Sequence, residues 1–197
     1  LQNGADVNAV DVKKRAALHW AVDGHVEVAK VLLQNGADVD AVSGVFYQET
    51  ALHCATQKGH VDFVKVLIQN GADVNAVNRF NWTALHYAVK EGHVDIVKVL
   101  IQNGADVNAV NEDKDTALHW ASEGGYVDVA KVLMQNGAEV DLVNEKDKTP
   151  IDIAVFRCDE VENDEDEPID IAVLRAQSDK DIHTALYLFC IGRARIT

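Results

Sequence analysis

One stretch occurs four times in nearly the same form and decides the fold; its clearest copy reads TALHYAVKEGHVDIVKVLIQNGADVN, residues 83–108. Its phrases recur in register: Gln-Asn-Gly-Ala stands at 34–37, 69–72, 102–105 and 135–138, and Ala-Leu-His at 17–19, 51–53, 84–86 and 117–119. The glycines of the first phrase, counted from Gly4, lie 32, 35, 33 and 33 residues apart. A fixed period of roughly 20–50 residues is the signature of a repeat protein.

Each copy predicts two short helices. The first begins at a threonine in three copies, where the hydroxyl can accept a hydrogen bond from an unpaired backbone N–H. The second follows Gly-His-Val and ends at Gln-Asn-Gly, where glycine can adopt the left-handed conformation. The expected helix pairs span about residues 16–36, 50–71, 83–104 and 116–137, with a half repeat from residue 149.

The second helix of each pair has a single polar stripe. In the third copy the stripe is Asp95, Lys98 and Gln102, and the same i, i+3, i+7 spacing recurs in the other copies. Most other positions are Val, Leu, Ile, Phe or Ala. A short helix that is apolar on most sides must lie between neighbours, so the repeats are expected to stack into a solenoid.

These phrases resemble ankyrin repeats. The resemblance rests on Thr-Ala-Leu-His, Gly-His-Val-Asp-Ile-Val-Lys-Val-Leu and Asn-Gly-Ala-Asp-Val-Asn-Ala, and it covers residues 1 to about 157, four full repeats with partial repeats at both ends. It implies an all-α solenoid of stacked helix-turn-helix pairs with projecting β-hairpin or loop fingers. It further implies a concave surface of finger tips and first helices that binds other proteins, without catalytic activity.

The resemblance also assigns the recurring histidines. It implies that His19, His53, His86 and His119 bond the motif threonine and nearby backbone, and that His25, His60 and His93 support the turn between helices. Because these histidines recur with the fold period and have no repeated Cys or Glu partner at zinc spacing, we expect no metal. No nucleophile stands in a strained elbow or beside a recurring base, so we expect no enzyme activity in these residues and no cofactor.

Residues 158–197 depart from the pattern and are expected to form an acidic loop and a degenerate helical cap. Asp152 stands where the histidine stood, residues 159–167 hold seven acids in nine positions, and residues 168–173 repeat residues 150–155. A last helix is expected from His183 to about Arg193. The acidic run is interpreted as a solvated loop; binding of a basic partner or of calcium is the alternative, although the glycine and ligand spacing of an EF-hand are missing.

Composition bounds the partners and the setting. The 197 residues carry 18 basic and 32 acidic side chains, a net charge of −14, which disfavours nucleic acid. The longest apolar run has seven residues, Ala185–Ile191, against roughly 18 for a membrane span, so no membrane insertion is expected. Three scattered cysteines predict an intracellular, cytoplasmic setting, with nuclear or host-delivered locations left open. A monomer is expected, and the start on Leu1 within a repeat phrase is interpreted as a fragment of a longer array.

The candidate binding residues are those at which the repeats differ. Aromatic residues in fingers are frequent interface anchors, so Phe46, Tyr47, Phe80 and Trp82 form the preferred patch. The other candidates share the fingers or the exposed part of the first helices: Gln57, Lys58, Arg79, Lys90, Glu91, Glu112, Asp113 and Asp115. The alternative is that Phe80 and Trp82 fold back on the adjacent finger as local packing. Trp20, Tyr87 and Trp120 are expected in the core between repeats.

Two functions remain in view. The preferred one is a protein-interaction scaffold; the alternative is the targeting segment of a larger enzyme, channel or secreted effector. The resemblance adds that Leu67 with Asn75, and Leu100 with Asn108, fit the pattern of ankyrin asparagines modified by an asparaginyl hydroxylase. Asn75 and Asn108 are therefore candidate hydroxylation sites.

Overall fold

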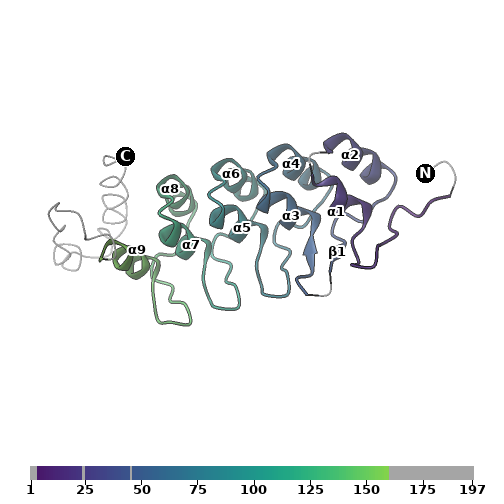
Figure 1. Cartoon of the computed structure of the whole chain (residues 1–197). Coiled ribbons are helices and arrows are strands. Elements are labelled where there is room, and N and C mark those ends of the chain that lie inside the picture. Colours follow the sequence, from purple (N-terminus) through teal and green to yellow (C-terminus); the bar gives the residue numbers. More distant parts are fainter. Residues whose placement is uncertain (1–3, 24, 45, 160–197) are drawn as a thin grey trace.

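Helix pairs stack side by side along the molecule, as the computed structural model shows (Figure 1). It describes residues 4–159 apart from 24 and 45. The pairs are α1 (Ala17–Ala21) with α2 (Val26–Gln34), α3 (Ala51–Gln57) with α4 (Val61–Gln69), α5 (Ala84–Lys90) with α6 (Val94–Gln102), and α7 (Ala117–Gly124) with α8 (Val127–Gln135), followed by α9 (Pro150–Asp159). The predicted all-α solenoid is confirmed.

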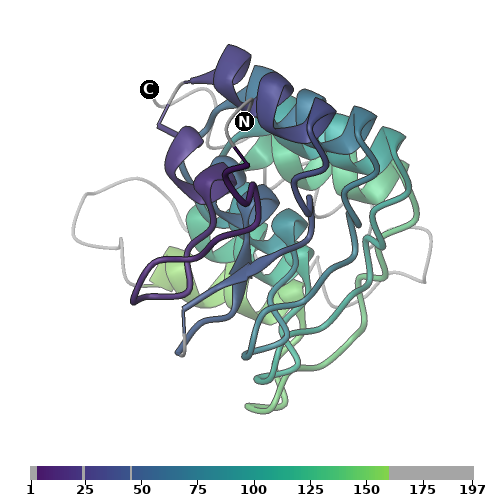
Figure 2. The same ribbon diagram turned by 90° about the vertical axis from the view of Figure 1, so that its right-hand side faces the viewer.

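The segments between helix pairs form fingers that project to one side. In one finger β1 (Val42–Ser43) pairs antiparallel with β2 (Glu49–Thr50). Equivalent fingers are held by single bridges, Val10 with Ala16 and Val110 with Thr116. Figures 1 and 2 show that the first helices lie between the fingers and the second helices.

Main-chain hydrogen bonds join each finger to the next. They run from Gly44 N–H to the Lys13 carbonyl, from Arg79 to Tyr47, from Glu112 to Phe80 and from Glu145 to Asp113, at 2.9, 2.9, 3.1 and 2.9 Å. Each finger tip also has one non-glycine residue in the left-handed region, with φ between 53° and 60°: Lys14, Gln48, Asn81, Lys114 and Asp147. The fingers therefore form a bonded row in which neighbouring tips lie close together.

The first helices begin as the Thr-x-x-His phrase predicts. In α5 the backbone N–H of His86 donates to Thr83 Oγ1 at 3.4 Å, and the N–H of Thr83 donates to His86 Nδ1 at 3.1 Å. The same capping box begins α3 and α7. At α9 the Asp152 carboxylate takes the part of the histidine, because it accepts from both the N–H and the hydroxyl of Thr149.

The core runs continuously between the stacked pairs. Small residues such as Ala84 and Ala88 are fully buried, which lets neighbouring helices approach. Leu52, Leu85 and Leu118 fill the same place in successive first helices. At the start of the described stack, Val28 of α2 is 50% exposed, whereas its equivalent in α4, Phe63, is 0% exposed. No described helix covers α2 on that side.

Trp20 corrects one expectation. It was expected in the core between repeats, but it is 52% exposed, while Tyr87 at the equivalent position of α5 is buried and Trp120 of α7 is half-buried. Tyr87 is covered by the ring of Trp82 from its own finger and bonded to the preceding finger at Glu49. Trp20 has only the guanidinium of Arg15 over its ring.

Several predictions fall outside the described part of the chain. The acidic run from residue 160 onward, the second copy at 168–173 and the helix expected at 183–193 all lie among residues 160–197. The boundary between the repeat array and a C-terminal cap therefore stays a prediction. Among the residues that the structure describes, no helix has the length and apolar character needed to cross a membrane.

Candidate protein-interaction surface

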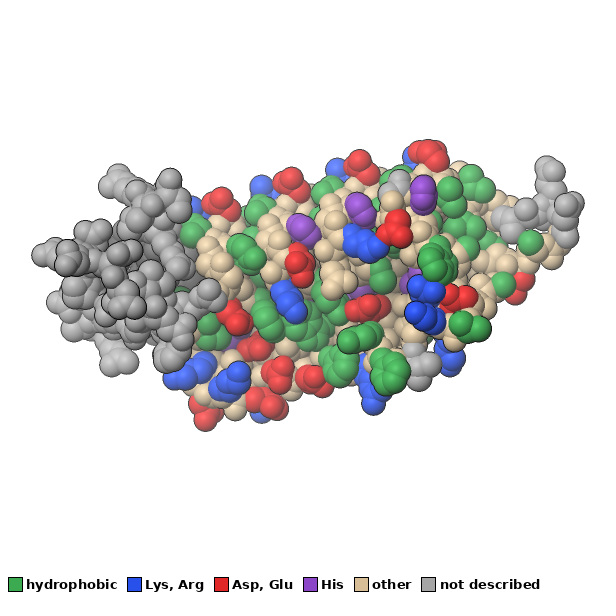
Figure 3. Space-filling model, viewed as in Figure 1, with side chains coloured by type: hydrophobic (Ala, Val, Ile, Leu, Met, Phe, Trp, Pro, Cys, Tyr) green, Lys and Arg blue, Asp and Glu red, His purple; other side chains and the backbone are tan. Residues whose placement is uncertain are grey.

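The first helices and the fingers together form one face of the solenoid, here called the inner face. It comprises α1, α3, α5 and α7 with the fingers that precede them, and Figure 3 views it directly. The second helices turn their polar stripe to solvent on the other side, where Asp95, Lys98 and Gln102 are all exposed. Variation between repeats therefore gathers on the inner face, as the sequence predicted.

Three aromatic side chains lie together at adjacent finger tips, and we call them the tip cluster: Phe46, Tyr47 and Phe80. Phe46 is 74% exposed and Tyr47 59% exposed, whereas Phe80 is half-buried. The rings of Tyr47 and Phe80 meet edge to face with centroids 5.8 Å apart. Figure 3 shows hydrophobic side chains gathered along the lower edge of the face, among the fingers.

Trp82 lies apart from the tip cluster, at the base of its finger. Its ring centroid is 4.9 Å from that of Trp120 on α7 and 5.1 Å from that of Tyr87 on α5. We call Trp82 and Trp120 the indole pair. The structure thus divides the predicted aromatic patch: Phe80 contacts the neighbouring finger, and Trp82 packs on the first helices.

The base of this finger is fixed by Asn78. Its buried side-chain oxygen accepts from the backbone N–H groups of Phe80 and Trp82, at 2.9 and 3.0 Å. Its amide donates to the hydroxyl of Tyr87 at 3.1 Å, and that hydroxyl donates to Glu49 Oε1 at 2.5 Å. Burial and the adjacent Glu49 carboxylate raise the pKa of Tyr87 well above its usual value, so the phenol stays a donor. Trp82 is therefore held in place by its own backbone.

Lys90 completes the indole pair. Its ammonium nitrogen lies 4.9 Å from the ring centroid of Trp82 and 5.4 Å from that of Trp120. The Lys90 side chain is otherwise exposed. Trp120 Nε1 is buried and has no hydrogen-bond partner among the residues that the structure describes. The sequence did not indicate this cluster, because Trp82 and Trp120 come from different repeats and are 38 positions apart.

The charged candidates are distributed along the same face. Gln57, Arg79, Glu91, Glu112 and Asp113 are exposed, and Asp115 is half-buried with its carboxylate accepting from the Asn144 amide at 2.7 Å. Lys58 is also exposed but forms an ion pair with Asp23. Acidic groups therefore dominate the face around the fourth finger.

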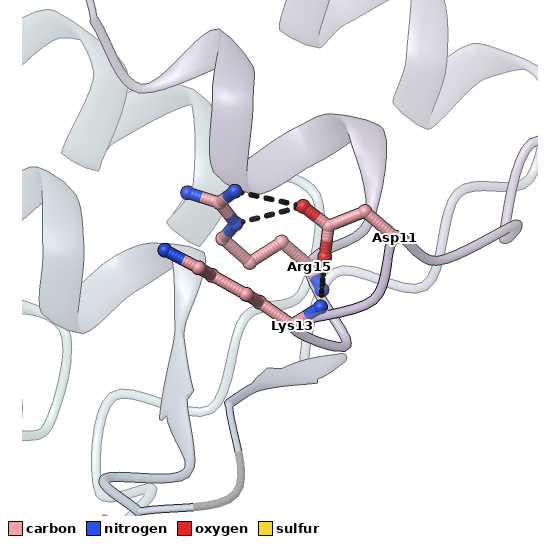
Figure 4. Close-up of polar contacts among 3 residues, drawn as sticks. All are labelled: Asp11, Lys13 and Arg15. Atoms are coloured by element: carbon pink, nitrogen blue, oxygen red, sulfur yellow. Dashed lines mark hydrogen bonds and ion pairs between the residues drawn. The ribbon is translucent and has the colours of Figure 1, made fainter.

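The first finger has the opposite sign. The guanidinium of Arg15 pairs with Asp11 at 2.8 Å, and the backbone N–H groups of Lys13 and Arg15 donate to the same carboxylate (Figure 4). These bonds, the one from the Arg15 backbone foremost, lower the pKa of Asp11. Lys13 and Lys14 are exposed. The sequence had shown this basic tip but not the stacking of Arg15 on Trp20 at 3.8 Å.

Asn75 and Asn108 join successive repeats. The amide of Asn75 donates to the Gly104 carbonyl at 3.0 Å, and its oxygen accepts from Asp106 N–H at 2.8 Å. Asn108 makes the same two bonds to Gly137 and Glu139. Both residues therefore have a structural role, and their hydroxylation stays a prediction.

The buried titratable groups are inert at neutral pH. Desolvation lowers the pKa of His53, His86 and His119, in His86 to about 4. Burial raises the pKa of the Cys54 thiol to about 12, so the nucleophilic thiolate does not form. Within the described ranges no group of three or more His, Cys, Asp or Glu side chains is arranged to hold a metal ion.

Stacked helix pairs, a bonded row of fingers and one variable face define a repeat solenoid of the kind that binds other proteins. Three family models described as ankyrin repeats match residues 13–44, 43–111 and 100–154. The chain belongs to the ankyrin repeat family. A comparison with curated proteins gave no match. Ankyrin repeats are in general non-catalytic modules for protein–protein interaction.

Proposed function

We propose that this chain binds a partner protein through the inner face, with the tip cluster as its anchor. The observation that carries the proposal is the exposure of Phe46 and Tyr47 next to Phe80 on adjacent fingers. Large apolar side chains that stay exposed in a group are typical of interfaces, and aromatic residues supply much of the binding free energy there.

The surrounding residues set the rim of this interface. Arg79 and Gln57 stand beside the tip cluster on the same finger row or the adjacent helix, and Lys58, Lys90 and Glu91 lie at the ends of the first helices. Glu112, Asp113 and Asp115 extend the surface toward the fourth finger. Charged rim groups of this kind affect the association rate and its salt dependence more than the final affinity.

The test is affinity capture of the partner from the native source, followed by measurement of its affinity for the purified variants. The double substitution Phe46→Ser with Tyr47→Ser is expected to weaken binding by about 30-fold or more, corresponding to about 2 kcal/mol. Because both side chains are exposed, the free energy of unfolding should change by less than about 0.5 kcal/mol.

The matched control is Val143→Ser, which removes an exposed apolar side chain beyond the tip cluster. Its affinity for the captured partner should equal that of the unsubstituted chain. Equal affinity of the double variant and the unsubstituted chain, with both folded by circular dichroism, would remove the tip cluster from the interface.

Further proposals concern the context of the chain. An intracellular setting and a monomeric state are supported by the scattered cysteines and the acidic net charge of −14. A targeting segment of a larger enzyme, channel or secreted effector is the alternative, and the reading frame upstream of Leu1 tests it. Intact-mass analysis from the native source tests hydroxylation of Asn75 and Asn108.

A further inference from the structure

The indole pair already holds a cation from this chain. The Lys90 ammonium lies within about 6 Å of both ring centroids, the range in which the negative face of an indole attracts a positive charge. Trp82 is fixed by Asn78, and Trp120 lies on a helix with a capping box. The rings are therefore a preformed surface for a cation, and only their present occupant is mobile, since Lys90 is an exposed side chain at the end of α5.

The charges around the indole pair favour a second cation. Asp115 occupies the position of Trp82 one repeat further on, and Glu123 occupies that of Lys90. Glu91 follows Lys90 directly. Among the residues that the structure describes, none of these three carboxylates forms an ion pair. The nearest like-charged groups on the finger row, Arg79 and Lys114, are exposed at the tips.

We infer that the indole pair is a subsite for an arginine side chain of the partner protein, and that Lys90 occupies it while the protein is free. This inference rests on the proposed binding of a partner by the inner face. A planar guanidinium can stack on an indole and still direct N–H donors at carboxylates, which a lysine ammonium does less well. The subsite therefore selects a basic segment, docked with its arginine between α5 and α7 and near Asp115 and Glu123.

Displacement of Lys90 is the step that the incoming arginine must drive. The stem of Lys90 then moves to solvent, where a lysine regains rotamer freedom. Removing this competitor should raise the apparent affinity for arginine, since the rings are then vacant in every molecule. Lys90→Met keeps the length of the side chain and removes its charge.

The test uses a defined peptide and needs no knowledge of the partner. The chain holds three tryptophans, so its labelled indole N–H signals in an NMR spectrum report Trp20, Trp82 and Trp120 separately. The probe is the peptide acetyl-Gly-Ser-Arg-Ser-Gly-amide, and its control carries citrulline, the uncharged isostere, in place of arginine. The arginine peptide is expected to shift the Trp82 and Trp120 signals with saturable dependence on concentration, and the citrulline peptide to leave them unchanged.

Two substitutions sharpen the test. Lys90→Met should tighten arginine-peptide binding by about threefold or more. Lys114→Met removes the same charge from the exposed tip of the fourth finger and should change the affinity by much less. Trp120→Leu should abolish the shift of Trp82; if this variant does not fold, the citrulline and Lys90→Met comparisons still decide.

The inference is overturned if both peptides act alike, or if Lys90→Met and Lys114→Met have equal effects. These outcomes are independent of the proposed function, which fails only if no captured partner depends on the tip cluster. A partner that needs Phe46 and Tyr47 while the arginine peptide gives no shift would leave the interface in place and remove its cation subsite.

Discussion

At the scale of single residues, the motif histidines connect neighbouring repeats. His86 Nε2 lies 3.2 Å from the carbonyl oxygen of Asp115, which can only accept, so Nε2 carries the proton. Nδ1 is then the acceptor for the N–H of Thr83. His53 and His119 repeat the arrangement, with contacts to the carbonyl groups of Trp82 and Lys148. The ring must stay neutral, because a second proton on Nδ1 would face a donor.

We therefore expect the fold to lose stability in mild acid. The pKa of His86 is lowered from 6.5 to about 4, so between these values the unfolded chain takes up a proton that the folded chain does not. The free energy of unfolding is then fully retained above about pH 6.5 and falls as the pH decreases; His86 alone accounts for about 2 kcal/mol between pH 7 and pH 5. Urea unfolding at a series of pH values measures this loss.

The control is His86→Gln, which cannot titrate. It should be less stable than the unsubstituted chain at pH 7, since the bonds to Thr83 and Asp115 are changed, but its stability should depend less steeply on pH. An identical pH dependence of both proteins would assign the acid sensitivity to other groups.

At the scale of elements, one side chain per repeat connects each finger base to the next. Asn8, Asn75 and Asn108 each donate to the glycine carbonyl that follows the next second helix and accept from a backbone N–H beyond it. Asp40 holds the equivalent position in the second repeat. Its carboxylate accepts from Asp73 N–H at 3.1 Å but has no donor for the carbonyl of Gly71. Burial raises the pKa of Asp40, with Asp73 and Asp38 adding repulsion.

Asp40→Asn is expected to stabilise the protein. The raised pKa means that the charged carboxylate is disfavoured in the fold at neutral pH, and the amide removes this penalty while supplying a donor for Gly71. A gain of about 1 kcal/mol in the free energy of unfolding is expected. Chemical denaturation measures it, and Asn75→Asp provides the reverse change, which should destabilise by a similar amount. A destabilising Asp40→Asn would show that the carboxylate has a favourable partner in solution.

The repeat architecture could be predicted from the sequence because its determinants are local. Thr83 and His86 are three positions apart, and Gly104 ends its helix at a fixed distance from them. The inner face was less predictable. Trp20, Tyr87 and Trp120 share one position in the phrase, yet their exposure differs with the finger residue packed on each: Arg15 over Trp20, and Trp82 between Tyr87 and Trp120. Such contacts depend on pairs from different repeats.

At the scale of the whole molecule, stability should vary along the stack. A solenoid gains its free energy from single repeats and from contacts between neighbours. In this chain α5 and α6 have described neighbours on both sides, whereas α1 has five residues, no side-chain N-cap and an exposed Ala17. Amide hydrogen exchange should therefore be faster in α1 and α2 than in α5 and α6. Equal protection in all helix pairs would instead indicate that the array unfolds as one unit.

Ala16→Thr should reduce this difference. Ala16 stands where Thr50, Thr83 and Thr116 cap the other first helices, with similar backbone angles, and His19 Nδ1 is buried without a partner in the described part of the chain. The added hydroxyl can donate to that nitrogen and accept from the His19 N–H, which completes a capping box. We expect about 1 kcal/mol of stabilisation in the first pair and roughly fivefold slower exchange in α1. Ala16→Val has the same shape without the hydroxyl and should give neither effect, because the stabilisation comes from the two hydrogen bonds.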